Sequence, residues 1–179
     1  MICFDTSKLK NIVYHNCGQY EETTTFVNFR EKFNSSDLDL YMYSGCMLDE
    51  PPYGALAYIR TTLHEKYLEI IDIISTNKNM GNGKQLFFNL LQCIEIINKE
   101  QKINKITGEL SNVDFDHWNK LLHFYSNMNY YILKYNVGLN YSIEFNLDKG
   151  LSVDELINSM HLFKNKTIGF YYNIIPNSQ

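Results

Sequence analysis

The stretch that most constrains the fold runs from residue 67 to residue 98. Residues 67–75, YLEIIDIIS, form an almost continuous apolar run rich in isoleucine, which is typical of a strand covered on both faces of a sheet. Residues 85–98 repeat apolar side chains at helical spacing, with polar residues on the other side. The loop between them contains Gly81 and Gly83. This order predicts a strand, a glycine-containing loop and a helix.

The loop has the properties of an anion-binding site. The first turn of a helix leaves backbone N–H groups unpaired, and the helix dipole adds partial positive charge there. Glycines let the backbone approach a ligand closely, and Lys78 and Lys84 flank the loop with full positive charges. We therefore expect this site to bind a phosphate or pyrophosphate.

Two familiar phosphate motifs do not fit the loop. A Walker A loop is excluded because Lys78 stands where its first glycine is needed and Gln85 where its Ser or Thr is needed. A dinucleotide fingerprint is excluded because Leu86 stands at its third glycine. The pattern Lys78-x-x-Gly81-x-Gly83 resembles the acetyl-CoA pyrophosphate loop of the GNAT (Gcn5-related) N-acetyltransferases, Q/R-x-x-G-x-G/A. Lys78 keeps a positive charge at this position but lacks the forked donor group of an arginine. The alternative interpretation is a tight turn that only starts a helix.

A second segment carries the same resemblance. Residues 105–110 predict a strand, and residues 114–127 predict a helix with an aromatic and leucine stripe that includes Trp118 and Tyr125. The sequence YSNMNY from Tyr125 is similar to the family's Y-x-x-x-G-F ending, and Asn129 can take the glycine's left-handed conformation. The resemblance covers residues 53–147.

The resemblance implies an α+β fold with a mixed, mostly antiparallel central sheet flanked by helices on both faces. It implies a single acetyltransferase domain over residues 1–179. Its parts are an acceptor-side region, an acetyl-CoA-binding core and a C-terminal helix-strand extension, at residues 1–52, 53–147 and 148–179.

The other elements are predicted from local patterns. A first strand is expected at residues 2–4 or 11–14, and a helix over residues 19–33 because phenylalanines recur there at three and four. In the family this region lines the acceptor pocket. Further strands are expected at residues 37–43, 53–62 and 167–175, a hairpin at residues 130–135 and 139–147, and a helix at residues 152–163.

Composition excludes several classes of protein. Hydrophobic content of 45% and charged content of 20% are globular values, and a net charge of −4 argues against a nucleic-acid partner. The four cysteines form no C-x-x-C pair, so we expect reduced thiols, no metal and a cytoplasmic location. No signal peptide and no membrane-spanning run is expected. The chain is expected to be a monomer or a homodimer.

The resemblance also implies the acyl donor and its binding residues. Acetyl-CoA would be the donor, and backbone N–H groups at the end of the central strand would polarise its thioester carbonyl. The expected binding residues share the strand end, the loop and the second segment: Ile73, Ile74, Ser75, Lys78, Asn79, Met80, Gly81, Asn82, Gly83, Lys84, Asn112 and Tyr125. Trp118 stands where family members carry an Asn that contacts the cofactor.

Two carboxylates on the central strand could deprotonate the amine. Strand alternation predicts Glu69 and Asp72 on opposite faces, with Glu69 on the face of Ile71 and Ile73. Glu69 corresponds to the position where family members often carry an acid, so it is the preferred base. Asp72 or a water chain is the alternative, and Glu69 could simply face solvent.

Tyr125 matches the family tyrosine whose hydroxyl meets the CoA sulfur, so it is the expected acid. Alternatively, it only continues the apolar stripe of its helix. The sequence thus predicts an N-acetyltransferase that transfers acetyl directly to a primary amine in a ternary complex. The alternative hypothesis is a non-catalytic sensor or regulatory module that binds acyl-CoA. The acceptor stays open among aminoglycosides, polyamines, peptide N-termini, lysine and amino acids.

Overall fold

The structure, a computed structural model, describes residues 8–9, 12–17, 22–51, 53–76, 81–110, 131–134, 141–147 and 170–174. Its one α-helix in these ranges is α1 (Asn82–Asn98). Its strands are β1 (Ile12–Cys17), β2 (Glu22–Glu31), β3 (Ser36–Ser44), β4 (Ala57–Leu63), β5 (Tyr67–Ser75), β6 (Lys105–Leu110), β7 (Tyr131–Lys134), β8 (Tyr141–Asn146) and β9 (Phe170–Ile174).

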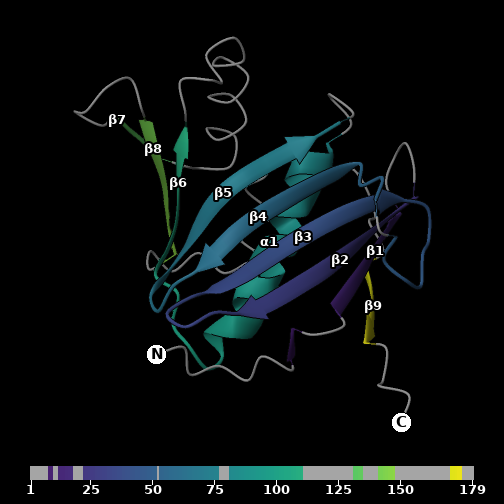
Figure 1. The fold of residues 1–179 in the computed structure, drawn as a ribbon, viewed down its shortest axis with the longest axis horizontal. Helices are drawn as coiled ribbons and strands as arrows, with labels where there is room; N and C mark the ends of the chain where they lie inside the picture. Colours follow the sequence, from purple (N-terminus) through teal and green to yellow (C-terminus); the bar gives the residue numbers. More distant parts are fainter. Residues whose placement is uncertain are drawn as a thin grey trace.

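The strands form one sheet in the order β7-β8-β6-β5-β4-β3-β2-β1-β9 (Figure 1). β5 and β6 are parallel, and the other neighbouring strands are antiparallel. A parallel pair needs a crossover connection, and α1 lies in the segment between β5 and β6. The predicted mixed, mostly antiparallel sheet is therefore confirmed. At one edge of the sheet, β9 pairs with β1.

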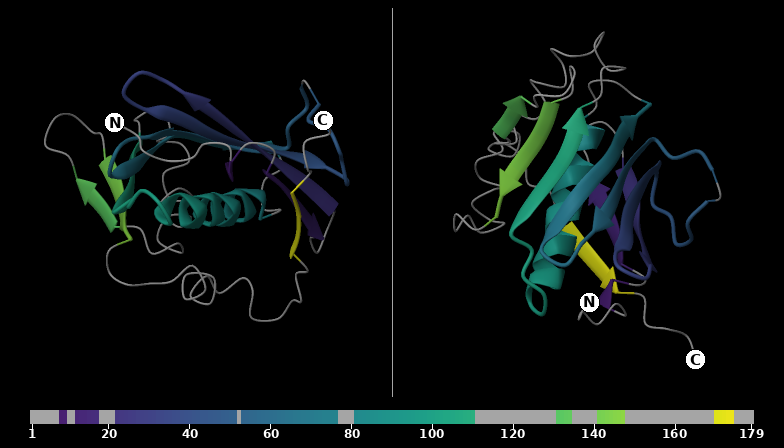
Figure 2. Two further views of the ribbon diagram at one scale, coloured as in Figure 1. Left: turned by 90° about the horizontal axis from the view of Figure 1, so that it is seen from below. Right: turned by 60° about the vertical axis from the view of Figure 1, so that its left-hand side comes forward.

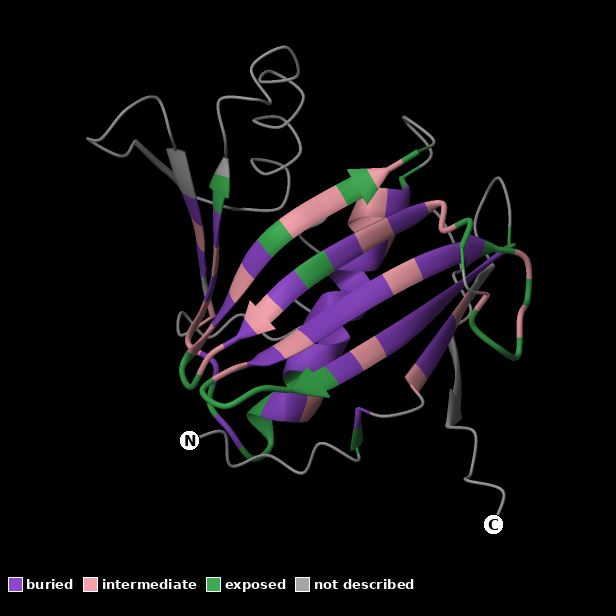
Figure 3. Cartoon of the chain, viewed as in Figure 1, coloured by how far each residue is buried: buried purple, intermediate pink, exposed green. Residues whose placement is uncertain are grey.

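The hydrophobic core lies between the sheet and α1, and the sheet curves around this helix (Figure 2). The predicted apolar stripe of α1 is buried, and Leu86, Leu90 and Ile97 have no exposed surface (Figure 3). They share one cluster with core residues of β3, β4 and β5, including Leu40, Ile59 and Leu68. Burying such side chains contributes about 1.5–3 kcal/mol each. Among the described residues, no helix is both long and apolar enough to cross a membrane.

The predicted strand at residues 67–75 is confirmed with the same bounds, as β5. The prediction of a helix over residues 19–33 is wrong, because residues 22–31 form β2. The three threonines at 23–25 are β-branched, and all are buried within the sheet. Phe33, the last member of the apparent helical repeat, is 98% exposed in the turn after β2.

Helices on both faces of the sheet are not confirmed. Over the described residues the sheet carries α1 on one face only. The predicted helices at residues 114–127 and 152–163 lie outside those residues. The predicted hairpin is confirmed by the pairing of β7 with β8, and the predicted last strand by β9.

Cys93 provides a probe of core opening. Its thiol is fully buried on α1, with its Sγ 3.4 Å from the Tyr14 hydroxyl oxygen. Burial raises the pKa of the Cys93 thiol from 9.0 to about 12, and the hydrogen bond to Tyr14 acts in the opposite direction. Because only the thiolate reacts, native Cys93 is doubly protected, by burial and by protonation.

We expect Cys93 to react with a maleimide at pH 8 at least about a hundredfold more slowly than the exposed Cys46, because it must await opening of the core. Peptide mapping by mass spectrometry over time measures both rates. Between about pH 9 and pH 12 the unfolded thiol ionises while the folded one does not, so this group makes stability fall as pH rises. Equal labelling rates at Cys93 and Cys46 would contradict the burial.

Candidate functional site

The predicted anion loop leads into an uncapped helix N-terminus. Gly81 is the N-cap residue of α1, and its φ of 78° lies in the left-handed region that favours glycine. No side chain of the described residues caps the helix, and no acidic residue stands in its first turn. The first-turn N–H groups of residues 82–84 are therefore suited to an anion. Lys78, Asn79 and Met80 lie outside the described residues.

Asn82 adds a buried donor at the same place. It is the first residue of α1, and only 6% of its surface is exposed. Its side-chain Nδ2 is buried and has no hydrogen-bond partner among the residues that the structure describes. Leaving a buried amide unpaired costs about 1–3 kcal/mol, so an acceptor group bound at this helix end would restore that energy.

β5 and β6 separate beside this helix end. Their pairing ends at Ile70 and Gly108, although β5 continues to pair with β4 as far as Ser75 and β6 with β8 as far as Leu110 (Figure 1). The edge of β5 at residues 71–75 is therefore not paired with β6. These residues include Ile73, Ile74 and Ser75, which the sequence predicted as thioester-polarising positions.

Gly108 stands at the last paired position. A Cβ there would lie 3.1 Å from the Ile70 carbonyl oxygen and 3.1 Å from the Ile143 Cδ1 atom, which is tighter than ordinary contact. Glycine therefore allows β6 to approach β5 at the point where the two strands part. The sequence signal for this was a single glycine inside a predicted strand, which often marks a close backbone approach.

A β-bulge in β5 corrects the predicted side-chain directions. Arg60 is opposite Asp72 and Thr61 is opposite Ile70, so Ile71 is an extra residue without a partner on β4. Glu69 is opposite Thr62. Since residues 60 and 62 share a face of β4, Glu69 and Asp72 share a face too, and the prediction of opposite faces is wrong.

Ile73 is also displaced by the bulge from the face that it was predicted to share with Glu69. It is opposite Ile59 and packs against the core cluster beneath the sheet. We call the other side the second face and define it by Tyr41, Tyr43, Tyr58, Glu69 and Asp72. The two candidate bases therefore lie on the second face, one on either side of the bulge.

Each carboxylate has a partner that fixes it. A Glu69 carboxylate oxygen lies 3.2 Å from Nε2 of His64, whose ring stacks on Tyr67 at 4.3 Å between centroids. An Asp72 oxygen accepts a hydrogen bond of 3.4 Å from the Tyr58 hydroxyl. Burial, followed by the nearby Asp72 charge, raises the pKa of Tyr58, so its hydroxyl remains a donor at neutral pH.

A second cluster brings His15 and Cys46 together, with 3.7 Å between Nδ1 and Sγ. Thr24 Oγ1 lies 3.2 Å from the same Nδ1 and gives its own proton to the Gly45 carbonyl at 2.7 Å. His15 must therefore donate from Nδ1 to Thr24. An Nδ1 that carries a proton cannot deprotonate Cys46, so this pair is not arranged as a nucleophile and base.

The remaining predicted residues, Asn112 and Tyr125, lie outside the described residues, and their roles stay predictions. Among the residues that the structure does describe, no group of three or more His, Cys, Asp or Glu side chains could hold a metal ion.

No protein-family model matches the chain, and no curated protein matches it. Solved structures do show similarity. One is a crystal structure from Desulfovibrio desulfuricans described as a GNAT-family acetyltransferase, with 12% identity and a TM-score of 0.45, covering 62% of this chain and 68% of that chain. Another is Tetrahymena Gcn5, with 12% identity and a TM-score of 0.37, covering 64% and 69%.

Proposed function

We propose that the protein is an acetyl-CoA-dependent N-acetyltransferase that acts by direct transfer to a primary amine in a ternary complex. The observation that carries this proposal is the uncapped N-terminus of α1 behind Gly81, next to the edge of β5 that β6 leaves unpaired. The first feature suits a pyrophosphate, and the second suits an extended acyl chain and its thioester.

Each group of residues makes a different contact with acetyl-CoA. The N–H groups at 82–84 and the Lys84 ammonium face the pyrophosphate, and Asn82 Nδ2 gains a phosphate or pantetheine acceptor. Lys78 adds charge from the loop. Backbone N–H groups at residues 73–75 polarise the thioester carbonyl. Asn112 contacts the cofactor from the second segment.

The chemical step then needs one base and one acid. Glu69 takes a proton from the acceptor ammonium, directly or through water, so that the amine is neutral when it attacks the carbonyl carbon. The new C–N bond forms and the C–S bond breaks. Tyr125 gives its phenolic proton to the departing thiolate and is reprotonated by the proton that the attacking nitrogen loses as the amide forms. Products are the N-acetyl amine and CoA.

The decisive assay measures free thiol released from acetyl-CoA against a panel of primary amines. Release that depends on both enzyme and amine, with N-acetyl product confirmed by mass spectrometry, supports the proposal. Firm acetyl-CoA binding without turnover on any amine would favour the non-catalytic acyl-CoA sensor instead.

Gly81→Asp is expected to weaken CoA binding by at least about tenfold, or 1.4 kcal/mol, because it places a negative charge where the pyrophosphate would lie. Gly81→Asn is the matched control: both side chains tolerate the left-handed conformation, and only Asp carries charge. An acidic group at a helix N-terminus is itself stabilising, so the variant should fold. Titration calorimetry with CoA measures the change, and equal affinity of the two variants would refute this site.

A further inference from the structure

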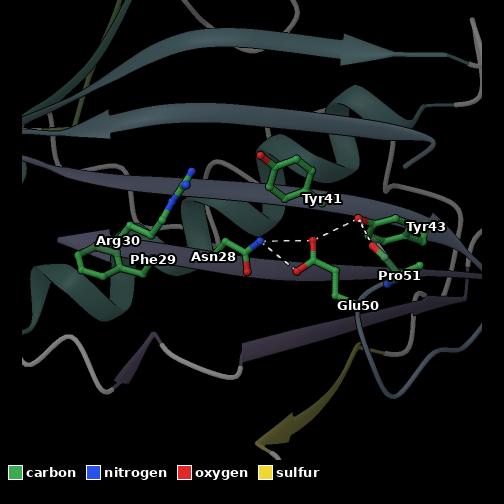
Figure 4. A pocket seen from close by; sticks show the side chains of 7 residues that line it. All are labelled: Asn28, Phe29, Arg30, Tyr41, Tyr43, Glu50 and Pro51. Carbon is green, nitrogen blue, oxygen red and sulfur yellow. Dashed lines mark hydrogen bonds between the residues drawn. The ribbon is translucent and has the colours of Figure 1, made fainter. Parts of the chain in front are cut away.

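A pocket of about 540 Å³ lies on the second face of the sheet, away from the bulge in β5 (Figure 4). It is formed by β2, β3 and the loop that follows β3. Its lining residues are Asn28, Phe29, Arg30, Tyr41, Tyr43, Glu50 and Pro51. Its volume falls in the range of small-molecule sites.

Glu50 provides a carboxylate fixed by neutral donors. Its Oε1 accepts hydrogen bonds from the Tyr43 hydroxyl at 3.2 Å and from Asn28 Nδ2 at 3.3 Å, and its Oε2 accepts from Asn28 at 3.0 Å. Over the described residues no basic side chain forms an ion pair with Glu50. Its negative charge is therefore positioned but not neutralised.

The one basic residue of the pocket is already compensated. An Arg30 guanidinium nitrogen lies 3.2 Å from a carboxylate oxygen of the buried Asp39 and 3.9 Å from one of Asp37. Asp37 also pairs with Lys32 at 2.6 Å, so Asp39 balances the single charge of Arg30. The uncompensated charge on the pocket wall is thus that of Glu50, and it is negative.

Aromatic rings connect the pocket to the candidate reaction centre. Tyr41 and Tyr43 line the pocket, and the Tyr41 ring lies 5.9 Å from that of Tyr58, its direct cross-strand partner. Tyr58 in turn donates to Asp72 beside the bulge. Asn28 and Tyr43, which hold Glu50, stand on β2 and β3, two to three strand spacings of about 4.8 Å, or roughly 10–15 Å, from β5.

We propose that this pocket binds the remote ammonium group of the acetyl acceptor, which makes the acceptor a small oligoamine. Glu50 supplies the counter-charge, and the tyrosine rings supply faces that attract cations. The second nitrogen of the oligoamine reaches the carboxylates beside the bulge. Acetylation of the second nitrogen rests on the proposed function. Binding of the remote ammonium in the pocket does not depend on it.

Acceptor kinetics test the inference with spermidine, which has a distant second ammonium, and butylamine, which has none. In Glu50→Gln the KM for spermidine is expected to rise by about tenfold with kcat within about twofold, as for loss of one hydrogen bond to a charged group. The KM for butylamine stays unchanged. Glu95→Gln, the same charge change on the exposed side of α1, is the control and leaves both KM values unchanged.

Calorimetry with spermidine alone separates this inference from the proposed function. Binding that Glu50→Gln weakens, in a protein without acetyl transfer to any amine, supports the pocket and overturns the transferase. Acetyl transfer with an unchanged spermidine KM in Glu50→Gln overturns the pocket and leaves the transferase. A wild-type preference for lysine-containing peptides over spermidine overturns the small-oligoamine assignment.

Discussion

Glu69→Gln is expected to lower kcat for acetyl transfer by about a hundredfold or more, within the usual range for losing a general base. Glutamine keeps the shape of the side chain and can still accept a hydrogen bond from His64, which lies 3.2 Å from the carboxylate. It cannot take a proton from the acceptor ammonium. The thiol-release assay measures the loss, and CoA affinity should stay within about twofold because Glu69 is distant from the α1 N-terminus.

Asp72→Asn is the matched control, because the bulge places both carboxylates on the second face. It should reduce kcat only severalfold, through loss of a charge and a weaker hydrogen bond from Tyr58. The reverse pattern, with a large loss in Asp72→Asn and a small loss in Glu69→Gln, would make Asp72 the base. Small losses in both single variants would reject a carboxylate base and favour a water chain.

Tyr125→Phe is expected to lower kcat by roughly tenfold to a thousandfold, because it removes the proton donor for the thiolate while keeping the aromatic ring. The affinity for acetyl-CoA should fall far less, since in the proposed site the loop and the first turn of α1 make most of that contact. Stopped-flow or steady-state thiol release measures turnover, and calorimetry measures binding.

Thermal unfolding supplies the control for Tyr125. If Tyr125 only completes the apolar stripe of its predicted helix, its phenylalanine variant will have normal specific activity and any change will be in the unfolding temperature. If the variant turns over at the wild-type rate across the pH range, Tyr125 is not the acid that the resemblance suggests.

The β5–α1 unit was predictable because its signals are local. A continuous isoleucine run, a glycine at a left-handed position and a 3.6-residue apolar period each depend only on neighbouring residues. The resulting bounds of β5 are the same in sequence and structure. The start of α1 was less well predicted: the helix begins at Asn82 rather than at residue 85, so Gly83 lies in its first turn and not in the loop.

The face of each β5 carboxylate was not predictable from alternation. A single unpaired residue, Ile71, reverses the pattern for everything after it, and its position depends on how β4 pairs with β5. The helix predicted over residues 19–33 failed for a related reason. The spacing of its phenylalanines was coincidental, and pairing with β1 and β3 on both sides determined its strand conformation.

The second-face pocket had no sequence signature at all. Glu50 belongs to a proline-containing turn, whereas Asn28 and Tyr41 belong to two different strands. Only the pairing of β2 with β3 and the return of the loop bring them together. Such sites depend on tertiary contacts between distant segments, which neither periodicity nor a short motif records.

The pairing of β9 with β1 has a consequence for the order of folding. Its partners, such as Tyr14 and Tyr172, are separated by most of the chain's length. During synthesis on the ribosome, β1 can pair with β2 early but must wait for residues 170–174 before its other edge is covered. Contacts of such long range form slowly, and an uncovered strand edge can recruit other chains. The nascent chain therefore passes through a stage in which one edge of β1 is uncovered and open to pairing with another chain.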